Sequence, residues 1–318
     1  MPLPVQFLLL IVGFALLMKG ADVFVDGSSA LADRMGIPQI VIGLTIVAFG
    51  TSAPEAAISI TAGIKGNADL AVSNVVGSNI LNVLLILGLS SVISPLMIQK
   101  NTLKYEIPFT ALVTLLLLGL GIWGHTVGRL DGVIFLLFMA AFMVYLVMMS
   151  KKNKPAADAE NKTADKMPVW KIILYIILGG AAIVFGSQIT VDSATEIAKY
   201  FGMSERLIGL TIVAFGTSLP ELITSVTAAI KHKADIAIGN IVGSNIFNIL
   251  FVLGVTAVIT PMKYTSAFIF DNLAALAAMV MLFVCVVKNK KLTRPGGIIM
   301  LISYAAYFVY IIKAAPAA

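Results

Sequence analysis

The stretch GLTIVAFGTSAPE at residues 43–55 returns almost letter for letter as GLTIVAFGTSLPE at residues 209–221. The likeness extends further, because residues 43–89 align without a gap on residues 209–255, and 30 of these 47 positions are identical. A match of this length at a constant offset of 166 residues indicates an internal duplication. Both copies place one glutamate in an otherwise apolar stretch, which makes that glutamate the first functional candidate.

The composition is that of a membrane protein. Of the 318 residues, 59% are hydrophobic and only 12% are charged, and the mean hydropathy is +1.00; soluble domains carry about 25% charged residues. Since about 20 apolar residues cross the hydrocarbon of a bilayer, the apolar stretches predict an all-α integral membrane protein with ten transmembrane helices. The expected spans are residues 4–24, 39–63, 70–95, 106–123, 130–149, 169–192, 205–230, 236–259, 266–287 and 296–313.

Ten spans divide into two halves of five. We expect an N-terminal five-helix repeat over residues 1–150, a charged linker over 151–168 and a C-terminal five-helix repeat over 169–318. Because five is odd, the second half must enter the bilayer upside down relative to the first, which is the inverted-repeat arrangement of secondary transporters. In that arrangement the substrate site lies between the repeats, near the membrane midplane.

The lysine and arginine residues predict the orientation of the chain. In the ten-span arrangement they gather in the loops on the side of the linker, and loops rich in these residues stay in the cytosol. We therefore expect a multi-pass protein of the cell membrane with a cytosolic linker and both termini outside. The same sorting by loop explains the net charge of +6 without a nucleic-acid partner. The single cysteine, Cys285, excludes a disulfide within the chain.

Two polar clusters recur in each repeat. The first is GTSAPE at residues 50–55, matched by GTSLPE at 216–221, and the second covers residues 74–82, matched by 240–248. A proline shortly after a glycine interrupts a helix, because proline lacks an N–H group and clashes with the preceding turn. We expect spans 2, 3, 7 and 8, which carry these clusters, to be broken helices that form the core.

The two repeated glutamates, Glu55 and Glu221, need a counter-charge that the motifs do not supply. A charged acid at the bilayer centre costs about 2.5–3.5 kcal/mol on insertion scales, and neither motif contains a basic residue. Protons or metal cations must therefore balance these acids. The neighbouring groups are hydroxyls, amides and backbone carbonyls, and such hard oxygens suit Na⁺, Ca²⁺ or Mg²⁺ rather than zinc or copper. Mg²⁺ is disfavoured, because it dehydrates reluctantly.

With both motifs doubled and correctly spaced, the chain resembles the cation/Ca²⁺ exchanger superfamily, and most closely its prokaryotic sodium/calcium exchanger branch. The resemblance rests on GTSAPE and GTSLPE, each followed by a GSNILN or GSNIFN segment, and it covers essentially all ten expected spans. It implies secondary active Na⁺/Ca²⁺ antiport by alternating access, commonly three Na⁺ against one Ca²⁺ and therefore electrogenic. It also implies that the first and sixth helices slide over a rigid core.

The resemblance further implies a set of ion ligands. In a central Ca²⁺ site it places the carboxylates of Glu55 and Glu221 with the backbone carbonyls of Thr51 and Thr217. In the flanking Na⁺ sites it places Thr51, Ser52, Ser78 and the Ala48 carbonyl on one side, and Thr217, Ser218, Ser244 and the Ala214 carbonyl on the other. Asn82 and Asn248 fall at the middle position. An amide at Asn248 favours independence from K⁺, since the potassium-dependent branch has an aspartate there.

Two other functions would use the same residues and stay open. A proton-coupled Ca²⁺ antiporter would take up protons on the same carboxylates. A passive cation channel would need a continuous pore, which an occluded midplane site between inverted repeats disfavours. An enzyme is a poor alternative, because the chain has no GxSxG, HExxH or Walker motif. Beyond the transported ions and the lipid bilayer, the sequence indicates no cofactor and no obligate protein partner.

Overall fold

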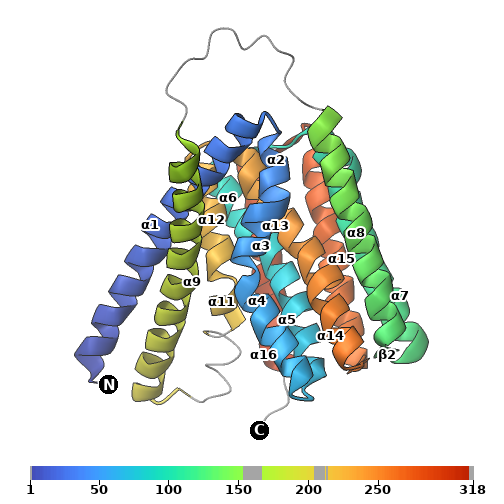
Figure 1. The fold of residues 1–318 in the computed structure, drawn as a ribbon. Helices are drawn as coiled ribbons and strands as arrows, with labels where there is room; N and C mark the ends of the chain where they lie inside the picture. Colours follow the sequence, from blue (N-terminus) through green and yellow to red (C-terminus); the bar gives the residue numbers. More distant parts are fainter. Residues whose placement is uncertain (1, 153–166, 204–211, 213, 315–318) are drawn as a thin grey trace.

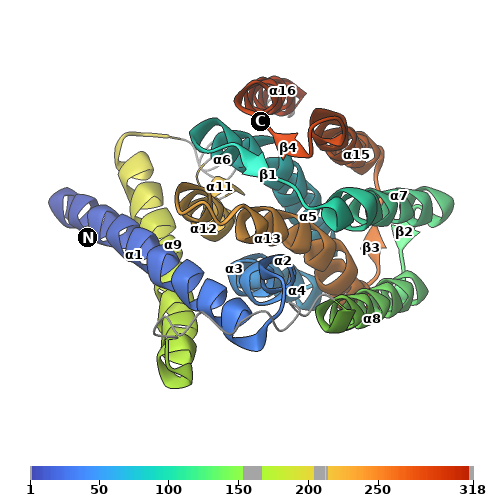
Figure 2. The ribbon, with the colours of Figure 1, turned by 90° about the horizontal axis from the view of Figure 1, so that it is seen from above.

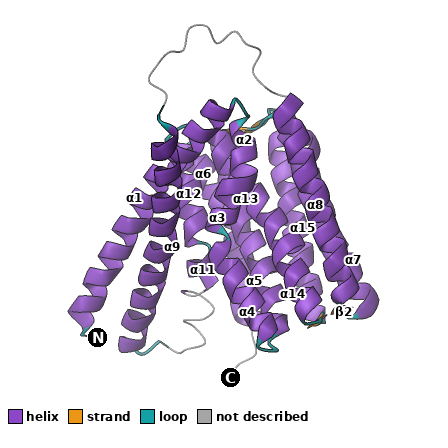
Figure 3. Cartoon of the chain, viewed as in Figure 1, coloured by secondary structure: helices purple, strands orange, loops and turns teal. Residues whose placement is uncertain are grey.

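The molecule is a bundle of long helices with a few very short strands (Figures 1 and 3). The structure is a computed structural model, and it describes residues 2–152, 167–203, 212 and 214–314. The first half contains α1 (Leu3–Met35), α2 (Gln39–Ile42), η1 (Gly43–Val47), α3 (Ala48–Thr51), α4 (Ala53–Ile64), α5 (Ala68–Leu81), η2 (Asn82–Leu87), α6 (Gly88–Ile93), β1 (Leu96–Met97), η3 (Thr102–Glu106), α7 (Ile107–Gly124), β2 (Thr126–Val127) and α8 (Arg129–Lys152), where η marks a π-helical segment. The second half contains α9 (Val169–Tyr200), α11 (Ala214–Thr217), α12 (Leu219–Ile230), α13 (Ala234–Phe247), η5 (Asn248–Leu253), α14 (Gly254–Ile259), β3 (Met262–Lys263), α15 (Ser266–Val287), β4 (Lys291–Leu292) and α16 (Arg294–Ala314).

Membrane-length helices dominate the described residues. Eight helices are long and apolar enough to cross a bilayer, and a ninth span is formed by Gln39–Thr51 and Ala53–Ile64, which meet at a bend of 52°. The expected span 205–230 falls partly outside the described residues, which contain its last part as α11 and α12. Most of the linker 151–168 also lies outside them. The all-α membrane fold is therefore confirmed, and the count of ten helices stays a prediction.

The break in the second span follows from its sequence. Ser52 separates α3 from α4 with φ −83° and ψ 5°, outside the helical region. Pro54 lies in the first turn of α4, where its missing N–H is harmless because the first N–H groups of a helix have no intrahelical partner. Ser218, with φ −96° and ψ 8°, separates α11 from α12 in the same way, ahead of Pro220. The predicted breaks in spans 2 and 7 are confirmed.

The prediction that spans 3 and 8 are broken is wrong. Residues Leu70–Ile93 and Ala234–Ile259 each form one continuous membrane-length helix. At Asn82 and Asn248 these helices change from α-helical to π-helical turns and then change back. Neither helix contains a proline, so no backbone donor is lost, and a wider π turn accommodates the irregularity within one continuous helix.

Spans 3 and 8 form the centre of the bundle. Of their apolar windows, 72% and 83% respectively are buried, against 17–33% in the other six long helices. Figure 2 shows α13 in the middle, with α7, α8, α15 and α16 towards the outside. The centre is packed backbone to backbone, because a Cβ on Gly239 would lie only 2.9 Å from the Cα of Gly43. Small residues allow this close approach between helices in membranes.

Helices α1 and α9 form a crossed pair at one side of the bundle (Figure 2). Glycines make their contact: a Cβ on Gly20 would lie 2.9 Å from the Cβ of Ala182, and a Cβ on Gly179 would lie 2.7 Å from the backbone nitrogen of Phe24. A side chain at these positions would push the two helices apart. The pair is therefore held by close backbone contact rather than by interlocking side chains.

Two small antiparallel sheets connect the halves at the ends of the bundle. In one, β1 pairs with β4 and Leu96 lies opposite Leu292; in the other, β2 pairs with β3 and Thr126 lies opposite Lys263. In one sheet the first half contributes β1 and the second half β4, and in the other the first half contributes β2 and the second half β3. An arrangement of this kind is what a two-fold relation between the halves produces.

Replacing Gly179 with alanine is expected to destabilise the protein, because the added methyl group would collide with the backbone of α1. Overpacking of this kind costs about 1–3 kcal/mol. Gly119 in α7 provides the matched control, because a Cβ there has nothing within 4 Å. Thermal unfolding in detergent should show a lower midpoint for Gly179→Ala and no loss for Gly119→Ala. Equal midpoints would contradict the close contact between α1 and α9.

Candidate cation site

Two fully buried glutamates lie where the helix breaks of the two halves meet. Glu55 and Glu221 are 0% exposed and lie in the first turns of α4 and α12. The hydroxyl of Ser52 donates a hydrogen bond to Oε1 of Glu221 over 2.7 Å, and the hydroxyl of Ser218 donates one to Oε1 of Glu55 over 3.1 Å. Each glutamate is therefore held by the serine at the break of the other half.

The serines of spans 3 and 8 complete two hydroxyl pairs beside the glutamates. The Oγ of Ser244 lies 2.8 Å from the Oγ of Ser52, and the Oγ of Ser78 lies 3.4 Å from the Oγ of Ser218. All four serines are buried. The structure thus brings the two glutamates together with four of the hydroxyls that the sequence named. One cluster contains Glu221, Ser52 and Ser244, and the other contains Glu55, Ser218 and Ser78.

Four asparagines join the two central helices next to these clusters. The Nδ2 of Asn82 donates to Oδ1 of Asn245 over 3.0 Å, and the Nδ2 of Asn248 donates to Oδ1 of Asn79 over 3.2 Å. The side chains of Asn79 and Asn245 each donate to the backbone carbonyl of the other, over 3.2 Å in both cases. Asn79 and Asn245 lie off the face of Ser78 and Asn82, so their position in the sequence indicates packing or support of the ligands rather than ligation. The structure adds that their contacts join the two halves.

Four buried oxygens in this region lack a hydrogen-bond partner among the described residues. They are Oε2 of Glu55, Oε2 of Glu221, Oδ1 of Asn82 and Oδ1 of Asn248. Leaving a buried acceptor unsatisfied costs about 1–3 kcal/mol, and more when it is charged. When the carboxylates are ionised, none of these four oxygens can donate a hydrogen bond. Each can only accept one or bind a cation. Carboxylate, amide and hydroxyl oxygens are the ligands that Ca²⁺ and other hard cations prefer.

The threonine and alanine positions are less decisive. The hydroxyl of Thr51 is within hydrogen-bond distance of two carbonyls of its own helix, Val47 and Ala48, and lies 2.9 Å from Oδ1 of Asn240. The Ala48 carbonyl also accepts the N–H of Ser52 over 3.0 Å. Thr217 and Ala214 belong to α11, beside the second break. The role of these four residues as ion ligands stays a prediction.

The sequence indicated no role for Asn240, which hydrogen-bonds to α12 next to the site. Its Nδ2 donates to the hydroxyl of Ser225 over 2.9 Å and to the backbone carbonyl of Glu221 over 3.4 Å. Its counterpart, Asn74, donates to the hydroxyl of Ser59 over 3.0 Å. Both asparagines lie in the duplicated cluster, so the duplication itself is the signal that could have identified them.

The acidic content of the site is limited to its two glutamates. Within the described residues, no three histidine, cysteine, aspartate or glutamate side chains form a group that could hold a metal ion. The remaining oxygens of the site come from neutral hydroxyls and amides. A site with two carboxylates and several neutral oxygens can bind and release a hard cation, as a transporter requires, more readily than a dense carboxylate cage.

The fold defines a multi-pass helical membrane protein, with a buried pair of carboxylates between two related halves as its candidate cation site. The chain belongs to the sodium/calcium exchanger protein family, whose sequence model matches residues 5–148 and 171–313. This membership makes it a membrane exchanger of the cation/Ca²⁺ type rather than an enzyme.

Individual relatives resemble the chain over most of its length. Inner membrane protein YrbG of Escherichia coli K12 is 40% identical over 265 residues, which cover 80% of this chain and 79% of YrbG. The sodium/calcium exchanger MaX1 of Methanosarcina acetivorans is 30% identical and covers 96% of this chain and 98% of its own. A solved structure of the sodium-calcium exchanger NCX_Mj superimposes with a TM-score of 0.85 at 30% identity, over 99% of this chain and 100% of that chain.

Replacing Glu221 with glutamine is expected to abolish stabilisation of the protein by Ca²⁺. The change removes one of two charges that oppose the ion, so the desolvation of Ca²⁺ is no longer compensated. The exposed Glu196, which pairs with Lys199 on the surface of α9, provides the control Glu196→Gln. Thermal unfolding with and without Ca²⁺ should show a shift for the parent and for Glu196→Gln only. A full shift in Glu221→Gln would remove this residue from the site.

Proposed function

We propose that the protein is a secondary active antiporter that exchanges Na⁺ for Ca²⁺ across the cell membrane by alternating access. The observation that carries the proposal is the pair of fully buried glutamates, each with one unpartnered carboxylate oxygen, at the junction of the two halves. A buried acid pair without a basic partner requires cations to balance its charge. An ion bound between Glu55 and Glu221 would therefore have ligands from both halves.

The charge of the site favours electrogenic exchange. Glu55 and Glu221 together contribute two negative charges when ionised, and Asn82 and Asn248 contribute none. One Ca²⁺ therefore neutralises the site, whereas three Na⁺ would exceed it by one positive charge. The ion-loaded forms would then differ in net charge, so the membrane potential would act on the transport cycle.

The hydroxyl clusters favour Na⁺ over H⁺ as the second ion. A proton needs only a carboxylate oxygen, whereas Na⁺ needs several oxygens around it. Ser52 and Ser244 lie together beside Glu221, and Ser78 and Ser218 lie together beside Glu55, so each side offers neutral oxygens next to a carboxylate. The relatives MaX1 and NCX_Mj are both named as sodium/calcium exchangers. Proton/Ca²⁺ antiport on the same carboxylates is the alternative.

The architecture supports transport by two inverted halves, over residues 1–150 and 169–318. The contacts between the halves come in pairs with exchanged roles, both at the site and in the two small sheets. Helix α8 ends and α9 begins at the end of the bundle opposite to the start of α1 and the end of α16 (Figure 1). We infer from the loop charges that the linker 151–168 is cytosolic and that both termini are outside.

Purified protein in liposomes tests the exchange directly. We expect an outward Na⁺ gradient to drive ⁴⁵Ca²⁺ uptake and an inside-positive potential to accelerate it, because net positive charge leaves with Na⁺. A pH gradient applied without Na⁺ should drive no uptake. Glu55→Gln should be inactive and Glu196→Gln active. Uptake driven by the pH gradient alone would establish the proton alternative, and uptake without any gradient of Na⁺ or H⁺ would indicate a channel.

A further inference from the structure

The hydrogen bonds of Asn79 and Asn245 fix the direction in which their amides point. Each side chain bonds to the backbone carbonyl of the other residue over 3.2 Å. A backbone carbonyl only accepts hydrogen bonds, so each amide must turn its NH₂ group towards that carbonyl. The oxygen Oδ1 of each amide then points the other way, as an acceptor. Both residues are almost completely buried, so water does not compete for these groups.

These two oxygens in turn fix the amides of Asn82 and Asn248. The partner of Asn82 is Oδ1 of Asn245 at 3.0 Å, and the partner of Asn248 is Oδ1 of Asn79 at 3.2 Å. Since an amide oxygen cannot donate, Asn82 and Asn248 must offer their NH₂ groups. Their own oxygens remain, and both lack a hydrogen-bond partner among the described residues.

The free amide oxygens lie on the helix faces that carry the cation site. Asn82 and Asn248 follow Ser78 and Ser244 by four residues, which places each asparagine on the same face as its serine. Those serines contact the hydroxyls that hold the glutamates. If either amide turned over, it would present an NH₂ group with partial positive charge to the ion instead of an oxygen.

We propose that Asn79 and Asn245 are positioning residues, which hold the amides of Asn248 and Asn82 with their oxygens directed at the transported cation. This inference rests on the proposed function and takes Asn82 and Asn248 as ion ligands, as the family resemblance implies. Each positioning residue acts across the junction between the halves. The ligand geometry of one half is thereby set by the other half, without any direct contact between Asn79 or Asn245 and the ion.

A double-mutant cycle on Ca²⁺ uptake tests this role. We expect Asn79→Ala to raise the KM for Ca²⁺ about tenfold, as loss of a buried hydrogen bond to a ligand would. In the background of Asn248→Ala the same change should have no further effect on KM, because the amide that it positions is absent. Asn82 is not the partner of Asn79, so the Asn79→Ala and Asn82→Ala effects should add. The cycle of Asn245 and Asn82 tests the same chemistry with independent variants if Asn79→Ala does not fold.

The outcomes separate this inference from the proposed function. An unchanged KM in Asn79→Ala, or effects of Asn79→Ala and Asn248→Ala that simply add, would show a merely structural role and overturn the inference while leaving the function intact. If Asn248→Ala and Asn82→Ala leave KM unchanged, neither amide is an ion ligand, and the inference is overturned while Na⁺-driven uptake still tests the proposed function.

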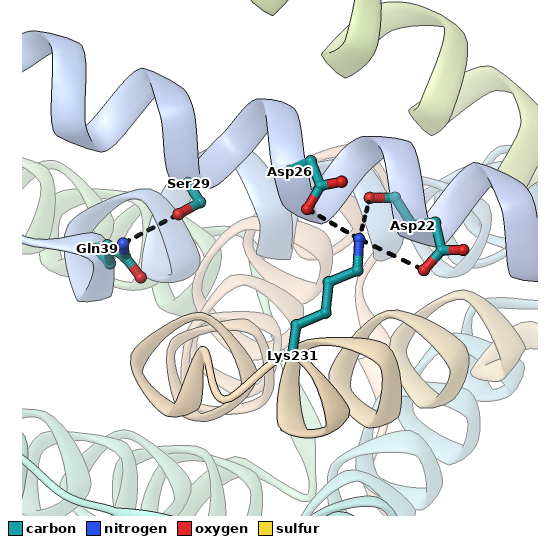
Figure 4. A network of polar contacts seen from close by, with 5 residues as sticks. All are labelled: Asp22, Asp26, Ser29, Gln39 and Lys231. Atoms are coloured by element: carbon teal, nitrogen blue, oxygen red, sulfur yellow. Dashed lines mark hydrogen bonds and ion pairs between the residues drawn. The ribbon is translucent and has the colours of Figure 1, made fainter. Parts of the chain in front are cut away.

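An independent observation concerns Lys231, at the end of α12. Its Nζ lies 2.8 Å from Oδ1 of Asp26 and 3.4 Å from Oδ1 of Asp22, and it donates to the backbone carbonyl of Asp22 over 2.9 Å (Figure 4). This lysine therefore ties the outer helix α1 to the core helix α12. The duplication predicts a matching pair 166 residues away, which consists of Lys65 at the end of α4 and Asp192 on α9.

The matching pair is not formed in the part of the chain that the structure describes. The helix packing shows the same difference between the halves. Helix α1 packs along α12, whereas no comparable contact joins their counterparts α9 and α4. Thr224 on α12 is 0% exposed, whereas its counterpart on α4, Ile58, is 40% exposed. Helix α12 is thus covered by α1, whereas its counterpart α4 is more exposed, although the two helices belong to the duplicated segment.

We further infer that Lys231–Asp26 and Lys65–Asp192 are alternating latches, each of which closes one side of the transporter while the other is open. A two-fold related pair of halves can exchange their arrangements, and the contacts that differ between them would then exchange as well. The latch also rests on the proposed alternating access. It needs no change in the core itself, because the lysines lie at the ends of α4 and α12.

Cysteine cross-linking tests the latches. Asp26→Cys with Lys231→Cys and Asp192→Cys with Lys65→Cys are made in a Cys285→Ala background and treated in liposomes with a short bifunctional thiol reagent. Mass spectrometry should find both cross-links, and each should stop Na⁺-driven uptake until it is reduced, whereas the four single-cysteine variants keep transporting. Failure of residues 65 and 192 to cross-link, or transport by cross-linked protein, would overturn the inference. Cross-linking needs no transport, so a failure of the proposed function is seen separately.

Discussion

Burial of two carboxylates at the junction of the two halves is the constraint on which the rest of the structure depends. Glu55 and Glu221 are inaccessible to solvent and lie beside the helix breaks, and neither forms an ion pair with a basic side chain among the described residues. Such a pair repels itself unless cations and oriented dipoles oppose its charge. The first turns of α4 and α12 provide part of that opposition, because the N-terminus of a helix carries partial positive charge. The serines of the opposite breaks provide hydrogen bonds.

The surrounding architecture brings two such breaks to one point. Glycines at positions 43 and 239 let the backbones of the two halves touch, which no larger residue would allow. Spans 3 and 8 remain continuous and pass through π turns at Asn82 and Asn248, and irregular turns of this kind are frequent at functional sites. The broken spans thus provide the charged groups, and the continuous spans provide a rigid frame with amides at fixed positions.

The sequence predicted those parts of the molecule that local chemistry decides. Pro54 and Pro220 located the breaks, and the duplicated glutamates and serines indicated the candidate site, which the structure describes as two buried clusters. The continuity of spans 3 and 8 was missed, because a polar cluster alone does not distinguish a break from a π turn. The contacts of Asn79, Asn245 and their partners could not be read from spacing, since each bond crosses between the halves and depends on how they pack.

The hydrogen bonds from Ser52 to Glu221 and from Ser218 to Glu55 each take one partner from each half, and the same holds for both small sheets. Neither half could therefore assemble a complete site on its own, and a single five-helix unit would need a second copy in the opposite orientation. The duplication also ties the two copies together in evolution. A change in one half alters the surroundings of a residue in the other, so the two sequences are constrained to diverge in step, most tightly at positions 52, 55, 218 and 221.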